Sequence, residues 1–176
     1  VSMQLDFITQ NKRSIYGGVA TFLFMGLGAF LLGNLSGYEA KVLIDTSLSG
    51  ISMLCNTIVL GSATILALLL TLLGISSGVE SKIKKIHYYQ VLNIAKFDTL
   101  LFIGALLLFQ FFNIPITESE NLPTSWFAYI YWATLFFSSL LSGFMVTVIL
   151  MLFTTFRDII NIVGFKKKDY LVDNDK

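Results

Sequence analysis

Charge is what most of this chain lacks. Four stretches contain no Asp, Glu, Lys, Arg or His: residues 14–38, 46–79, 99–117 and 121–156. Only 13% of the residues are charged, whereas a soluble domain carries about a quarter. An uncharged apolar run of about 18 residues or more is long enough to cross a bilayer as a helix. The missing charge therefore excludes a soluble globular domain as the main body of the chain and predicts a polytopic membrane protein.

The uncharged stretches also lack the residue types that chemistry within a membrane requires. They contain no carboxylate for a proton-coupled carrier and no arginine ladder for a voltage sensor. The single cysteine, Cys55, can form neither an internal disulfide nor a CxxC redox pair. The single histidine, His87, lies outside these stretches, which excludes an intramembrane Ser–His protease. We therefore expect a protein that is not an enzyme and that has no cofactor and no metal site.

The predicted fold is an all-α, four-transmembrane-helix bundle in which residues 1–176 form one domain. The last expected helix, residues 125–163, contains no proline. At 1.5 Å per residue it would be about 58 Å long, whereas the hydrocarbon core of a bilayer is about 30 Å thick. We expect it to continue into the cytoplasm; the alternative is a break near residues 154–155 followed by an interfacial segment. The expected helices cover roughly residues 14–35, 48–77, 97–113 and 125–163, with a basic cytoplasmic loop at 80–97.

The basic residues alternate from loop to loop. Eleven of the twelve Lys and Arg residues lie in three segments, at 12–13, 82–96 and 157–176; Lys41 is the exception. Lys and Arg in short loops favour the cytoplasmic side. Both termini are therefore expected in the cytoplasm, with the chain passing several times through a bacterial inner (plasma) membrane; the richness in Ile, Lys, Asn and Phe favours a bacterial source.

Small residues recur at four-residue spacing in the first two expected spans. Such ridges let two helix backbones approach closely in lipid. They indicate packing within the bundle more readily than a dimer motif, although both interpretations remain open. The expected packing positions are Ala29, Gly33, Gly37, Gly61, Gly74 and Gly78.

The fourth span carries a stripe of small and polar residues. Facing a neighbouring helix, the stripe would supply close packing; facing an oligomer axis, it could line a narrow hydrated pathway. The amides of Asn56, Gln110 and Asn113 should also seek partners between helices. The stripe consists of Thr134, Ser138, Ser139, Ser142, Gly143 and Thr147.

Two functions fit these observations. The first is a non-enzymatic, oligomeric membrane subunit that anchors or senses for a soluble cytoplasmic partner. Its architecture is similar to that of the small four-span protein of two-gene anti-phage systems such as Kiwa, and to that of immunity proteins against pore-forming colicins, although the chain carries no motif of either group. The alternative is a homo-oligomeric channel or pore. Direct nucleic-acid binding is not expected, because membrane attachment explains the basic runs. The residues expected to contact the partner or the lipid are Lys82, Lys84, Lys85, Arg157, Asp158, Lys166, Lys167 and Lys168.

Overall fold

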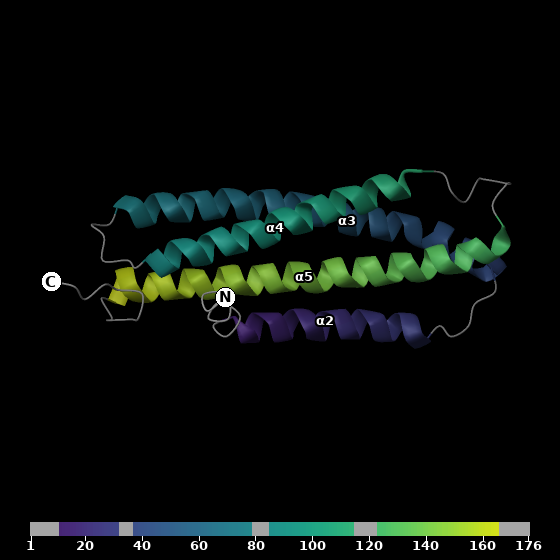
Figure 1. Cartoon of the computed structure of the whole chain (residues 1–176), viewed down its shortest axis with the longest axis horizontal. Helices are drawn as coiled ribbons and strands as arrows, with labels where there is room; N and C mark the ends of the chain where they lie inside the picture. The colour runs from purple at the N-terminus through teal and green to yellow at the C-terminus, as the bar shows by residue number, and fades with distance from the viewer. Residues whose placement is uncertain (1–10, 32–36, 79–84, 115–122, 166–176) are drawn as a thin grey trace.

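Four α-helices make up the part of the chain that the computed structural model describes, which is residues 11–31, 37–78, 85–114 and 123–165. They run alternately up and down, so that α2 and α4 start at the end of the bundle where α3 and α5 finish (Figure 1). The predicted all-α class is confirmed. The helices are α2 (Lys12–Leu31), α3 (Gly37–Gly78), α4 (Lys85–Phe112) and α5 (Thr124–Phe165).

Three of these helices are long and apolar enough to cross a membrane. The qualifying stretches are Glu39–Gly74 in α3, Tyr88–Phe112 in α4 and Ser125–Ile160 in α5, as far as the described residues go. The fourth helix, α2, is 20 residues long and begins with Lys12 and Arg13. Helices of this length and composition are those of a membrane-associated protein.

Two helices begin much earlier in the sequence than hydropathy predicts. The expected basic loop at 80–97 is corrected, because α4 already starts at Lys85. Helix α3 starts at Gly37 instead of near residue 48, and so it takes up the charged residues of the expected outer loop. Residues 38–49 and 80–103 contain no Gly or Pro that would stop a helix from extending. Helix α5 runs through residues 154–155 without a break.

The buried residues of α3, α4 and α5 recur with heptad spacing. In α4 the buried residues are spaced alternately three and four apart, and the same spacing recurs in the other two helices. An average period of 3.5 residues is the pattern of helices that pack along a left-handed seam. The buried α4 positions that keep this spacing are Val91, Ile94, Asp98, Leu101 and Ala105, with Gln90 buried beside the first of them, and those along the main part of α3 are Ile51, Cys55, Ile58, Ser62, Ile65, Leu69 and Leu72.

Helix α5 is the centre of the bundle. Helix α2 packs on one side of it, while α3 and α4 pack against each other and against its other side (Figure 1). The main core contains Ile58 and Ile65 of α3, Leu101 of α4, and Val148 and Leu152 of α5.

A smaller core joins the first turns of α3 and α5 at one end of the bundle. It contains Ala40 and Ile44 of α3 with Phe127 and Tyr131 of α5. The Lys41 ammonium lies 5.3 Å from the centre of the Phe127 ring, within cation–π range. At this end of the bundle, side-chain packing therefore holds the start of α3 against the start of α5.

Candidate functional site

Helices α2 and α5 meet at a close contact between two glycines. A Cβ atom on Gly18 would lie 2.6 Å from the Gly143 carbonyl oxygen and would also collide with Thr147. Conversely, a Cβ atom on Gly143 would lie 2.6 Å from the Gly18 carbonyl oxygen. Only glycine allows the two backbones to come this close.

The hydroxyl stripe on α5 lies inside the bundle. Thr134, Ser138, Ser139, Ser142 and Gly143 are buried and Thr147 is half-buried. The Ser142 hydroxyl donates to the Ser138 carbonyl at 2.9 Å, and the Thr147 hydroxyl donates to the Gly143 carbonyl at 2.9 Å. Since Thr134, Ser138, Ser139 and Ser142 are buried in the bundle, the stripe presents no outward row of hydroxyls.

The other expected packing positions differ in how closely a neighbouring helix approaches them. A Cβ atom on Gly61 would lie 2.6 Å from the Met145 Cε atom, so this glycine supports the contact between α3 and α5. A Cβ atom on Gly74 would meet nothing within 4 Å, so a larger side chain would fit at this position. Gly33, and the surroundings of Ala29, Gly37 and Gly78, lie outside the described residues.

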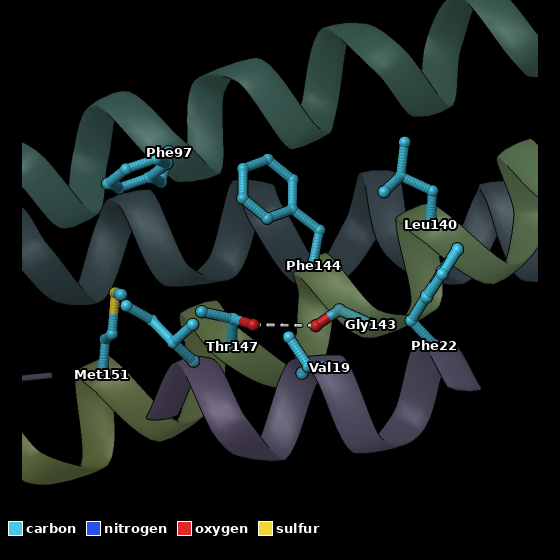
Figure 2. Close-up of a pocket in the computed structure, with 10 residues that line it drawn as sticks. Val19, Phe22, Phe97, Leu140, Gly143, Phe144, Thr147 and Met151 are labelled. Atoms are coloured by element: carbon cyan, nitrogen blue, oxygen red, sulfur yellow. Dashed lines mark hydrogen bonds between the residues drawn. The ribbon is translucent and has the colours of Figure 1, made fainter. Parts of the chain in front are cut away.

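A lateral groove opens between α2, α4 and α5, with a cavity volume of about 520 Å³ (Figure 2). The rings of Phe97 and Phe144 meet edge to face on its wall, with centroids 5.7 Å apart. The Thr147 hydroxyl already donates to Gly143, so the groove offers apolar contact and no acid–base chemistry. The lining residues are Ile15, Gly18, Val19, Phe22, Phe97, Leu140, Gly143, Phe144, Thr147 and Met151.

A buried carboxylate lies between α3 and α4, and sequence reasoning missed it. Asp98 of α4 is 0% exposed, and neither of its carboxylate oxygens has a hydrogen-bond partner. The Ser62 hydroxyl of α3 faces it. Ser62 is also 0% exposed and its oxygen has no partner either. The two groups therefore face each other in the core without hydrogen-bond geometry between them.

The heptad spacing of apolar residues in α4 is the sequence signal that predicts burial of Asp98. The residue occupies the central position of the buried series from Val91 to Ala105. Hydropathy alone marks Asp98 as the boundary between a loop and a span, because the uncharged stretch begins at Thr99. The expectation that no ionisable side chain lies inside a span is corrected: Asp98 lies ten residues inside the apolar stretch Tyr88–Phe112.

The expected contact residues are described only in part. The Arg157 Nη2 atom lies 3.6 Å from the Asp158 Oδ1 atom, and the Arg157 side chain is 56% exposed. Lys85 opens α4, but its side chain lies outside the described residues. The other expected contact residues lie entirely outside the described residues: Lys82, Lys84, Lys166, Lys167 and Lys168.

No group of three or more His, Cys, Asp or Glu side chains that could hold a metal ion occurs among the described residues. Comparison of the chain with protein-family models, with curated proteins and with solved structures finds no match. The function must therefore be argued from the geometry of the bundle.

Proposed function

We propose that this chain is a non-enzymatic integral membrane subunit that anchors or senses for a soluble cytoplasmic partner. In this proposal all four helices cross a bacterial inner membrane, and both termini lie in the cytoplasm. The observation that carries the proposal is the length of α5, which is one continuous helix of 42 residues.

The length of α5 exceeds what a bilayer can accommodate. Its uncharged part, residues 125–156, corresponds to about 48 Å of helix at 1.5 Å per residue. A helix tilted by about 40° passes through roughly 39 Å of its own length in crossing a 30 Å hydrocarbon core. About 9 Å of apolar helix is left over even then, and the turns that carry Arg157 and Asp158 lie beyond it. Apolar helix surface outside the hydrocarbon favours a protein partner that covers it.

The end of α5 has the features of a docking surface. The exposed Arg157 guanidinium and the neighbouring Asp158 carboxylate belong to the last turns of α5, which ends at Phe165. This end of α5 lies where α3 finishes and α4 begins (Figure 1). Charges at the rim of an interface steer a partner and fix its orientation. Helices α2 and α4 begin at this end, with Lys12 and Arg13 in α2 and Lys85 in α4, and Lys and Arg near helix ends support a cytoplasmic location for it.

Self-association is part of the proposal. Asn56 is exposed on the outer side of α3, within the apolar stretch Glu39–Gly74. A side-chain amide in hydrocarbon requires a hydrogen-bond partner, and helix–helix contacts between copies supply one. Asn56 therefore supports homo-oligomerisation through α3.

The pore alternative receives no such support. A pathway along an oligomer axis requires polar side chains that point outward. The α5 stripe is buried apart from the half-buried Thr147, and the hydroxyls of Ser138, Ser142 and Thr147 donate to carbonyls of α5 itself. We therefore make no second proposal from the stripe.

The proposal is tested by purifying the intact chain from its native host in mild detergent and identifying the soluble proteins that accompany it in stoichiometric amount. Replacing Arg157 and Asp158 together by alanine should lower recovery of the partner about tenfold, because rim charges contribute on the order of 1 kcal/mol or more. The matched control is Lys41→Ala, at the opposite end of the bundle. Absence of a stoichiometric soluble partner, or equal recovery with all three proteins, contradicts the proposal.

A further inference from the structure

Among the described residues, no opposite charge lies beside the Asp98 carboxyl group. The two helices packed against α4 contribute only neutral side chains at this level, since α3 has no charged residue over 46–78 and α5 has none over 124–156. On α4 itself, the nearest basic residue is Lys96, which is exposed. The basic residues of α2, Lys12 and Arg13, are exposed as well. None of the basic side chains that the structure describes therefore offers an ion pair to an ionised Asp98.

Other titratable groups near Asp98 are few. Helix α3 contributes the thiol of Cys55, which is buried two helical turns from Ser62 and about 10 Å away along the axis. Helix α5 contributes Tyr131, which packs in the smaller core at the far end of the bundle. The hydroxyl of Ser62 is the polar side chain that faces Asp98 directly.

The two protonation states of Asp98 make different demands on this site. An ionised carboxylate only accepts hydrogen bonds, through about four lone-pair positions, and Ser62 can satisfy one of them at most. A buried charge without a partner is strongly unfavourable. A protonated carboxyl group is neutral and has one O–H to donate, and the facing Ser62 oxygen can accept it.

We propose that Asp98 is a proton-binding site, which holds its proton while α3 and α4 are packed together and donates it in a hydrogen bond to the Ser62 oxygen. Loss of the proton to water leaves a carboxylate that the closed bundle cannot satisfy. Proton release is therefore coupled to separation of α3 from α4, which admits water to the carboxylate. This inference concerns the interior of the bundle and does not depend on the soluble partner proposed above.

The first test is infrared spectroscopy of the full chain in lipid vesicles at neutral pH. The chain has eleven Asp and Glu residues, and exposed carboxyl groups are ionised at this pH. A carbonyl band from one protonated carboxyl group is expected in the native chain. Asp98→Asn should remove the band, whereas the matched control Asp45→Asn, at an exposed position of α3, should retain it. Absence of the band from the native chain, or its persistence in Asp98→Asn, overturns the proposal.

The Ser62 part of the proposal has its own variant. Ser62→Ala should keep the helical content and the protonated band but shift the frequency of that band, because the hydrogen bond is lost. An unshifted band would overturn the role of Ser62.

The second test is equilibrium unfolding in mixed micelles as a function of pH. Raising the pH favours any state in which Asp98 can ionise, so the native folding equilibrium constant should fall by up to about tenfold per pH unit. Asp98→Asn should remove this dependence and Asp45→Asn should keep it. Parallel pH profiles for the native chain and Asp98→Asn overturn the proposal. Stabilisation by Na⁺ at constant pH that Asp98→Asn abolishes also overturns it, because a metal cation would then be the ligand.

Discussion

The three helices α3, α4 and α5 and the single helix α2 are held in the bundle in different ways. Helices α3, α4 and α5 share a continuous seam of buried side chains that repeats every three or four residues. Helix α2 packs chiefly on α5, through the contact of Gly18 with Gly143. Much of its remaining surface is exposed, including Tyr16 at 71% and Phe24 at 78%.

This difference shows two ways in which long apolar helices can be joined. Lipid chains are as apolar as leucine, so moving a side chain from lipid into a helix interface contributes little free energy to helix association. Close packing between the helices must then supply the attraction. The seam obtains its contacts from many interlocking side chains, whereas α2 obtains them from the close approach of two backbones. Helix α2 is therefore the element that a single substitution should separate from the rest.

The largest expected effect comes from Gly18→Leu. The new side chain would overlap the Gly143 backbone and Thr147, which should weaken the docking of α2 by about 2–3 kcal/mol and leave α3, α4 and α5 assembled. The distance between spin labels at the exposed positions Phe24 and Tyr129, in a Cys55→Ala background, should change from narrowly distributed to broad.

The control for that substitution is Gly26→Leu on the same helix. A Cβ atom at Gly26 meets nothing within 4 Å, so the label distance should stay narrow. If the two leucine variants behave alike, the glycine contact is not what joins α2 to α5.

A smaller effect is expected from truncation in the seam. Leu101 is 1% exposed, and Leu101→Ala should lower the free energy of unfolding by about 2 kcal/mol, because the cavity term remains even where the transfer term is small. Equilibrium unfolding in mixed micelles measures the loss. Leu107→Ala, at a position that is 67% exposed, should change stability by less than about 0.5 kcal/mol; equal losses would show that the seam is not the core.

The smallest effect is expected from the hydroxyl stripe. Ser142→Ala removes one hydrogen bond, to the Ser138 carbonyl of the same helix, and should cost no more than about 1 kcal/mol. The same unfolding measurement applies. A loss of several kcal/mol would mean that Ser142 bonds to another helix or to another copy of the chain.

Helix class and the approximate length of α5 could be predicted from the sequence because they depend on local properties: uncharged apolar runs and the absence of proline. The starts of α3 and α4 could not be predicted from hydropathy, which ends a span at the first charged residue. Asp45 and Asp98 border the uncharged runs that begin at residues 46 and 99, but an aspartate does not stop a helix.

The buried position of Asp98 depends on which face of α4 meets α3, and that is set by packing between distant parts of the chain. The heptad spacing of Val91, Ile94, Leu101 and Ala105 places Asp98 on the same face. The close contact of Gly18 with Gly143 could not be singled out, because many glycines have similar spacing and only the crossing of two helices selects a pair.

The central claim is that α5 crosses the membrane and continues beyond it, and collision accessibility of spin labels along α5 tests this most directly. Phe137 and Ile149 are exposed within the uncharged part of the helix, and Ile160 is exposed beyond Arg157. The account predicts that labels at Phe137 and Ile149 collide mainly with oxygen, which concentrates in hydrocarbon, and that a label at Ile160 collides mainly with a water-soluble metal chelate. Preference for the chelate at Phe137 and Ile149, or for oxygen at all three positions, would contradict it.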